Sequence, residues 1–442
     1  MRSTDTAQES VPVVAESPVA SPTEIQAREA LDIFIAVLII VALAAISTTK
    51  RFMRLQRNRV LAALVAGGLP AFIVGVILGK NVLGVVEGET LLEVRPLVNI
   101  GLSWIGVIIG MQASRQAVRL VPKVLWKWVC LDTCTSLLIS ASLVIIVGYW
   151  WFPASGFSAA WLLLPILVVS TSTIGWSPET RSLSRNMTPG TSTLASLIQG
   201  GSGLSSLIAI LFFGILSHLH VRTATEEVNV MPLAAIGDVA LVIVIAVLLG
   251  LGCRWLLDRT SGRHGERVLV LLGILALLGG FSADLGLSPL LTSMIFGIII
   301  GNMARGTKSL ELLLTGGEHA TAVFFYVLAG ALLETNLPVQ AWVVILVLVL
   351  FRWIVKPLVG KWMLAGVIED QERGHRLWSA VTRQAPLAIV IGCSLVLMES
   401  SHLNRSLLSI IVIVSIISTV MGSAPLRVHG SARSSASMEA AT

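Results

Sequence analysis

The sequence predicts an all-α polytopic membrane protein with about 13 transmembrane helices, built as an inverted repeat in which two discontinuous helices cross near the bilayer midplane. Three observations predict this fold class: the composition, a series of apolar stretches of spanning length, and a similarity between early and late stretches. Of the 442 residues, 55% are hydrophobic and 13% are charged, and the mean hydropathy is +0.86. A soluble fold could not bury so much apolar surface.

The chain divides into a membrane domain and two polar tails. Residues 1–30 are rich in Ser, Pro, Glu and Ala and lack the pattern of a cleavable signal peptide, so we expect a disordered tail. Residues 31–422 form the predicted membrane domain, and residues 423–442 a second, cytoplasmic disordered tail. The apolar stretches are long enough, or nearly so, to cross about 30 Å of hydrocarbon at about 1.5 Å per residue. They centre on Ile40, Ala71, Ile105, Leu138, Ile166, Ser205, Val244, Ala276, Ile295, Leu328, Val349, Ile389 and Ile413.

Basic residues in the loops predict the orientation. The net charge of +6 does not indicate nucleic-acid binding, because the basic residues lie between the spans, where they act as topology signals. They are concentrated in the loop at 50–59 and in every second loop after it. The other loops hold only Lys80, Arg95, Arg222 and Arg405. This asymmetry predicts a multi-pass protein of the cell (inner or plasma) membrane, with its N-terminus outside and its C-terminus in the cytoplasm.

An internal repeat relates early spans to late ones. The second span, LPAFIVGVILGKN, and the ninth, LSPLLTSMIFGIIIGN, share an early proline and two glycines four residues apart. The third span, WIGVIIGMQ, and the tenth, YVLAGALLET, follow in the same relation. The partners are offset by seven spans, an odd number, so the repeats would face opposite ways, as in secondary transporters.

Two spans carry residues that interrupt a membrane helix. In the fifth span, hydroxyl side chains replace apolar ones at Ser170, Thr171, Ser172 and Thr173, and the sixth contains the run Gly200-Gly201-Ser202-Gly203 followed by Ser205. Where the backbone leaves the helix within the membrane, its polar groups must be satisfied by other parts of the protein or by a water-filled cavity. The two interruptions therefore predict a binding site between these spans. Close helix packing by small residues is the alternative reading. In the twelfth span, Pro386 beside Arg383 predicts the second interruption.

These stretches resemble the monovalent cation:proton antiporter superfamily, which includes the sodium/proton exchangers and the potassium-efflux antiporters. The similar segments are LPAFIVGVILGKNVLG, GLSWIGVIIGMQ, GLSPLLTSMIFGIIIGN, FFYVLAGALLETNL and TRQAPLAIVIG. The resemblance covers nearly everything from Asp32 to Met421 in order. It implies the antiporter fold, transport of a monovalent cation against protons, and a homodimer.

The acids that the resemblance leads us to expect are missing. Members usually carry an aspartate in the break of span five and an Asn-Asp or Asp-Asp pair in span six. Here the first position falls in 170–173 and the second in 201–205, and neither holds an acid. The signature of span three often ends Gly-Leu-Glu, and this chain reads Gly110-Met111-Gln112. Hydroxyls and carbonyls can ligate sodium, but they cannot couple its release to a proton.

Ionisable residues within the spans are therefore the candidates for the ion and proton site. They are Asp132, Arg352, Lys356 and Arg383, with Gln384 beside the last. Asp132 and Lys356 lie at similar depth from the cytoplasmic end of their spans, and Arg352 shares a helix face with Lys356. We therefore expect Asp132 to meet Arg352 or Lys356. Such a pair could carry protons or bind substrate, or it could be an ion pair that only joins the two repeats.

The leading function hypothesis is a secondary active transporter that performs cation/proton antiport, similar to a sodium/proton exchanger, through an atypical ion site. An anion or organic-acid transporter on the same fold, or a non-transporting membrane sensor, is the alternative. An enzyme is not expected, because no nucleophile and base occur at suitable spacing. We expect no cofactor or metal site; the four cysteines lie in apolar stretches, as small packing residues do.

Overall fold

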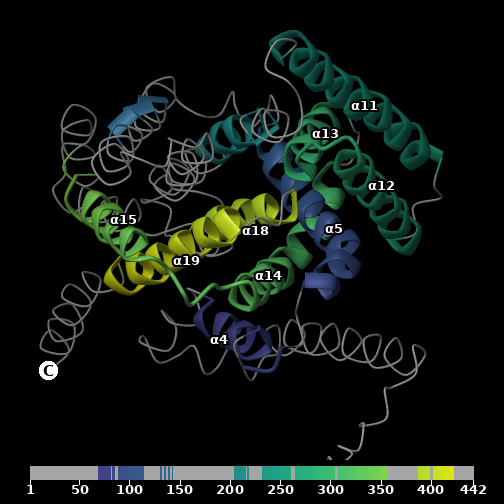
Figure 1. Ribbon diagram of the computed structural model, residues 1–442. Coiled ribbons are helices and arrows are strands. Elements are labelled where there is room, and N and C mark those ends of the chain that lie inside the picture. The colour runs from purple at the N-terminus through teal and green to yellow at the C-terminus, as the bar shows by residue number, and fades with distance from the viewer. Residues whose placement is uncertain are drawn as a thin grey trace, which may run out of the picture.

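The computed structural model describes residues 68–80, 82–84, 88–113, 130–131, 134–135, 138–139, 142, 204–215, 217–218, 231–259, 264–303, 307–355, 358, 387–398 and 402–422. The elements of this part are helices (Figure 1). They are α4 (Leu69–Leu78), α5 (Gly88–Gln112), α11 (Met231–Arg259), α12 (His264–Asp284), α13 (Pro289–Met303), α14 (Thr307–Ala331), α15 (Val339–Leu350), the π-helical turn η3 (Phe351–Val355), α18 (Leu387–Met398) and α19 (His402–Gly422). A further helical segment covers Leu204–Ile215.

The described helices fall on the predicted spans. Two of them are long and apolar enough to cross a bilayer on length and composition, Glu93–Gln112 and Glu266–Asp284. Shorter apolar helices of 10–17 residues lie at the predicted second, sixth, seventh, ninth, eleventh, twelfth and thirteenth spans. The tenth span was predicted to centre on Leu328, but α14 covers Thr307–Ala331. The helix therefore lies further toward the N-terminus than predicted. The first and fifth predicted spans lie outside the described residues.

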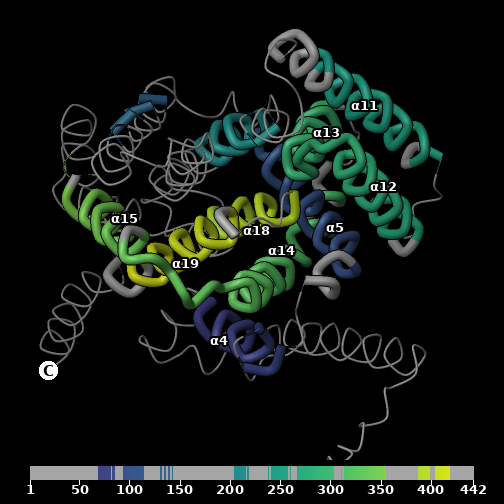
Figure 2. Tube along the Cα trace, in the orientation of Figure 1, coloured from purple at the N-terminus to yellow at the C-terminus, as the bar shows by residue number. Residues whose placement is uncertain are grey.

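Two glycine-lined crossings hold the second, third, ninth and tenth spans together, as α14 packs along α4 and α13 along α5 (Figure 2). At the first crossing, a Cβ placed on Gly75 would lie 3.0 Å from the Cα of Gly330. At the second, a Cβ on Gly110 would lie 3.0 Å from the Cα of Gly297. Only glycine allows the backbones to approach this closely. The second span thus packs on the tenth and the third on the ninth, the reciprocal pattern that a two-fold relation between repeats requires.

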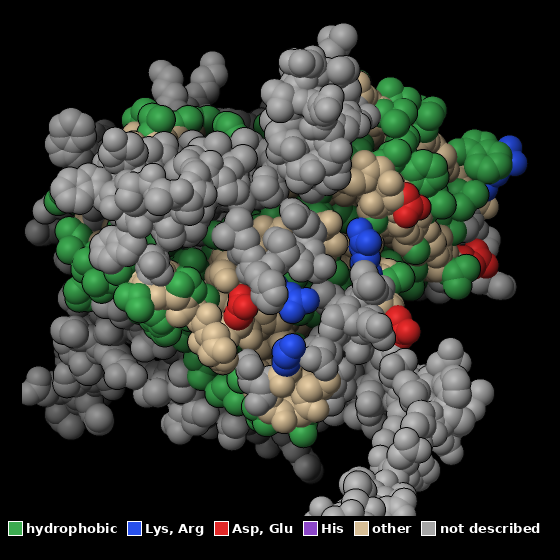
Figure 3. All heavy atoms as spheres, viewed as in Figure 1, with side chains coloured by type: hydrophobic (Ala, Val, Ile, Leu, Met, Phe, Trp, Pro, Cys, Tyr) green, Lys and Arg blue, Asp and Glu red, His purple; other side chains and the backbone are tan. Residues whose placement is uncertain are grey.

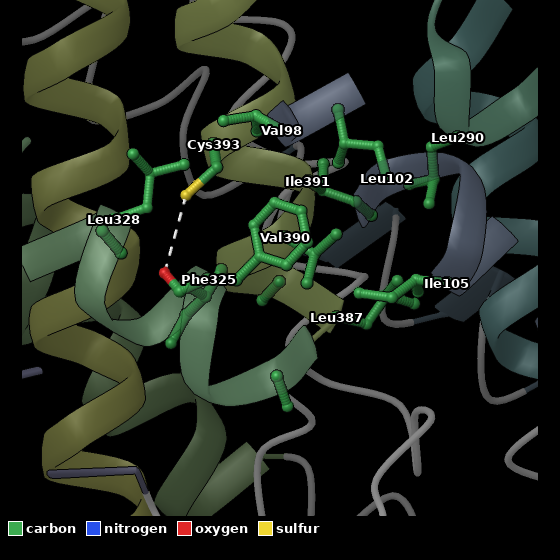
Figure 4. Packing of buried hydrophobic residues seen from close by; sticks show 14 of the residues in the cluster. Val98, Leu102, Ile105, Leu290, Phe325, Leu328, Leu387, Val390, Ile391 and Cys393 are labelled. Atoms are coloured by element: carbon green, nitrogen blue, oxygen red, sulfur yellow. Dashed lines mark hydrogen bonds between the residues drawn. The ribbon is translucent and has the colours of Figure 1, made fainter. Parts of the chain in front are cut away.

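Helix α18 forms the centre of the packed core. Every residue from Leu387 to Leu397 is buried, as is expected for a helix that is apolar on all sides. Figure 4 shows Val390 and Ile391 lying between side chains of α5 and α14, and the Cys393 thiol pointing toward the carbonyl oxygen of Phe325, 4.0 Å away. The described part of the predicted twelfth span, Leu387–Met398, is therefore a buried helix. The predicted interruption at Arg383 and Pro386 lies outside the described residues.

Helices α11 and α12 present apolar side chains outward. Leu248 is 62% exposed and Leu269 is 75% exposed, and hydrophobic side chains cover this part of the surface in Figure 3. Only 28% of the most apolar stretch within Glu266–Asp284 is buried. Such a surface is stable in contact with lipid or with another apolar surface, not with water.

Candidate functional site

Ser205 and Arg352 are the predicted site residues that the structure describes. Ser205 lies one residue into the described part of helix Leu204–Ile215, and it is buried together with Ser206. The other predicted hydroxyl residues, Ser170, Thr171, Ser172, Thr173 and Ser202, lie outside the described residues. The interruption of span five and the glycine run of span six therefore stay predictions.

Arg352 lies inside the π-helical turn η3 that continues α15. Its side chain is 4% exposed, so the guanidinium is held within the protein and does not reach water at the helix end. A π-turn inserts an extra residue into the helical ladder, a local distortion that is frequent at functional sites. Whether Arg352 belongs to the ion site stays a prediction.

The expected partners of Arg352 lie outside the described residues, namely Asp132, Lys356, Arg383 and Gln384. Whether Asp132 meets Arg352 or Lys356 therefore stays a prediction. In the part of the chain that is described, no three His, Cys, Asp or Glu side chains come together as a metal site, and the four cysteines are free.

Glu318 is a buried acid that the sequence reasoning missed. It lies at the middle of the 25-residue helix α14, and its side chain is only 3% exposed. The helix is fixed around it: the indole Nε1 of Trp104 donates a hydrogen bond to the carbonyl of Leu314 at 3.1 Å, and the hydroxyl of Thr321 donates to the carbonyl of Gly317 at 2.9 Å. A buried carboxylate in a membrane helix is a candidate for proton exchange.

The sequence contained a signal for Glu318. In the stretch TGGEHATAVFFYVLAGA, the two glycines and the charged pair Glu318-His319 look like the end of a loop. However, the run from Thr307 to Ala331 has no proline, and 25 residues can continue as one helix. Extending the span backwards would have placed Glu318 inside it.

Glu334, which resembles the acid that closes the tenth-span signature of the superfamily, joins two helices just after α14. Its carboxylate Oε2 accepts a hydrogen bond from the Ser406 hydroxyl at 2.8 Å. Its backbone N–H donates to the Ser409 hydroxyl at 2.9 Å. Both serines belong to α19, so this half-buried acid has a structural role at the end of the helix bundle.

The comparisons with known proteins agree with this architecture. The family model described as "Sodium/hydrogen exchanger, transmembrane" matches residues 41–427. Among solved structures, the fold is similar to that of the sodium proton antiporter MjNhaP1 from Methanocaldococcus jannaschii at pH 8, with 15% identity, a TM-score of 0.58, and coverage of 88% of this chain and 96% of that chain.

An electron-microscopy structure of the same antiporter is similar at 14% identity, with a TM-score of 0.56 and coverage of 92% of this chain and 96% of that chain. No curated protein matches the chain. The all-helical fold therefore matches the antiporter fold over most of its length. By its family match, which covers most of the sequence, the chain belongs to the sodium/hydrogen exchanger family of multi-pass membrane transporters.

Proposed function

We propose that this protein exchanges a monovalent cation for protons across the membrane through an atypical ion site. The observation that carries the proposal is the sodium/hydrogen exchanger match over residues 41–427. The similar fold of MjNhaP1, described as a sodium proton antiporter, supports it. The site is atypical because hydroxyl and glycine residues occupy the positions where the superfamily usually has acids.

The proton-coupling carboxylate in this proposal is Asp132, facing Arg352 or Lys356. An unpaired carboxylate at membrane depth would cost several kcal/mol and would take up a proton instead, so a basic partner at matching depth is required. The burial of Arg352 supports this arrangement, because a guanidinium inside the protein needs an acceptor nearby. Glu318 is an acid that the structure shows buried in helix α14, and it is the alternative carrier.

The proposed architecture is an inverted repeat in which broken spans five and twelve cross near the midplane. The reciprocal glycine crossings of α4 with α14 and of α5 with α13 support the repeat. Transport then moves the broken-helix core against the scaffold. Outward apolar side chains on α11 and α12 are compatible with a homodimer.

The test is flux in proteoliposomes that contain the purified protein and an internal pH indicator. An outward proton gradient is imposed, and sodium, potassium and lithium are added outside in turn as chloride salts. Antiport predicts that at least one cation dissipates the gradient in a saturable manner. If no cation does so while the protein remains folded, the proposal is wrong.

Anion or organic-acid transport is the second candidate, supported by the buried guanidinium of Arg352. Replacing chloride by sulfate or gluconate, which do not cross the bilayer as neutral acids, at constant sodium separates the two functions. A flux rate that changes with the anion but not with the cation would favour this second candidate. A non-transporting sensor would give no flux with any ion.

The proposed orientation places the N-terminus outside and loop 50–59 in the cytoplasm. In a background that lacks the four native cysteines, an Asn58→Cys variant should react with an impermeant maleimide only from the cytoplasmic side. Labelling of intact cells from outside would reverse the topology.

A further inference from the structure

A pocket lies where the first part of α5, the turn between α12 and α13, and the end of α18 meet. It is lined by Arg95, Asn99, Leu102, Ala283, Gly286, Leu287, Pro289, Ser394, Leu397 and Met398. Its cavity volume is about 30 Å³, so the pocket can enclose a small polar group, and the rest of a larger ligand would extend through the open mouth. The proposed topology places this end of the bundle on the external side, away from the cytoplasmic loops.

Helix α5 supplies two donors to this pocket. Arg95 and Asn99 are four residues apart, so they share one helix face. Asn99 is 6% exposed, and within the part of the chain that is described neither side chain has a hydrogen-bond or ion-pair partner. A ligand that accepts hydrogen bonds from Asn99 and Arg95 would satisfy both donors at once.

The opposite wall comes from α18. Ser394 is 1% exposed, and its hydroxyl oxygen lies 3.5 Å from that of Ser288, which precedes α13. The two hydroxyls can rotate so that one of them donates into the pocket. A ligand held between Arg95 and Ser394 would therefore touch two helices that are far apart in the sequence.

A rigid turn forms the third wall. After α12, the N–H of Leu287 donates to the carbonyl of Ser282 at 2.8 Å, and the N–H of Gly286 donates to that of Ala283 at 3.1 Å. This is the Schellman pattern at a helix end, and the φ of 67° at Gly286 explains the glycine. Behind the turn, Nδ1 of His218 lies 3.3 Å from the carbonyl oxygen of Gly286. The pocket is thus shaped before a ligand arrives.

The chemistry of the lining selects the ligand. A guanidinium fork, a carboxamide and a hydroxyl match a planar carboxylate, which arginine can bind through two parallel hydrogen bonds. The side chains of Leu102, Leu287 and Leu397 offer apolar surface for a hydrocarbon body. A halide would leave that surface empty, and Arg95 repels a cation. We propose that this pocket binds a carboxylate that carries an apolar body.

Two acids flank the pocket without lining it. Glu93 and Asp284 are exposed, so their charges are largely screened by water and salt. They still weaken the binding of an anion. Asp284→Asn should therefore bind the carboxylate a few-fold more tightly than the unaltered protein at low ionic strength.

The experiment measures binding to the full chain in lipid nanodiscs by titration calorimetry and by thermal stability. The probes are butyrate, a water-soluble carboxylate, and laurate, which partitions into membranes; chloride and sulfate at equal sodium are the controls. Saturable binding of either carboxylate is expected, and the probe that binds identifies the aqueous or the membrane source. No binding of either one, or equal binding of chloride or sulfate, would overturn the proposal.

Variants locate the site. Arg95→Gln and Asn99→Leu should each weaken carboxylate binding by at least tenfold, and Ser394→Ala by a few-fold. Arg405→Gln is the matched control, because Arg405 is also half-buried but does not line the pocket. Its affinity should be unchanged. If Arg95→Gln binds as tightly as the unaltered protein, the pocket is not the site. This readout does not depend on cation/proton exchange, so it can fail or succeed separately from the proposed function.

Discussion

Replacing Gly110 with alanine should destabilise the crossing between α5 and α13. The new Cβ would lie 2.9 Å from the backbone nitrogen of Ile298 and 3.0 Å from the Cα of Gly297, and it would also meet the carbonyl oxygen of Met294. All three are backbone atoms, so no side chain can rotate away. Ordinary carbon contacts need about 3.5–4.0 Å, so the helices must separate, and overpacking of this kind costs about 1–3 kcal/mol.

Gly273→Ala in α12 is the matched control, because nothing lies within 4 Å of a Cβ at that position. Both variants gain about 0.5–1 kcal/mol from the higher helix propensity of alanine. The difference between their melting temperatures therefore reports the overpacking alone. Melting curves are recorded with a thiol-reactive dye in a background with Cys130→Ser and Cys134→Ser, so that the dye reports the buried free thiols of Cys253 and Cys393. Gly110→Ala should melt several degrees below Gly273→Ala. Equal melting temperatures would refute the tight crossing.

Two further changes test hydrogen bonds between helices. Trp104→Phe removes the indole donor to the carbonyl of Leu314 and should lower the free energy of unfolding by about 0.5–1.5 kcal/mol. The control is Trp342→Phe, at a side chain that is 50% exposed, which should change stability by less than about 0.5 kcal/mol. Equal melting temperatures of the two variants would refute the role of the indole. Ser406→Ala removes the donor to Glu334 and should cost about 1 kcal/mol. In a double-mutant cycle, Ser406→Ala should cost less when Glu334→Gln is already present, and strict additivity would contradict this contact.

The sequence was sufficient to predict the parts of the fold that depend on pattern. The glycines of the second and ninth spans were recognised as a repeat, and Gly75 and Gly297 lie at two equivalent crossings in the structure. Apolar runs also located the described helices. Hydropathy could not predict which helix is buried within the protein and which faces lipid, because the lipid hydrocarbon and the protein interior both favour apolar side chains. α18 is buried on every side, whereas α12 exposes Leu269, although both are apolar runs.

The candidate site was less predictable. Arg352 was chosen because an arginine within an apolar run is costly unless it has a role. The structure places its side chain inside the protein, and its part in the ion site stays a prediction. Glu318 was missed because the tenth span was centred on Leu328, and only the extent of α14 places Glu318 well inside a helix. The pocket at Arg95 depends on three segments that are far apart in the sequence, so no local pattern could predict it.

The most direct test of the central claim is proton-coupled flux in proteoliposomes with the Asp132→Asn variant. This change keeps the shape of the side chain and removes its charge. We expect cation-driven dissipation of the pH gradient in the unaltered protein, its loss in Asp132→Asn at unchanged helical content and melting temperature, and its survival in Glu318→Gln. Coupling that persists in well-folded Asp132→Asn would contradict the proposal that this carboxylate carries the proton.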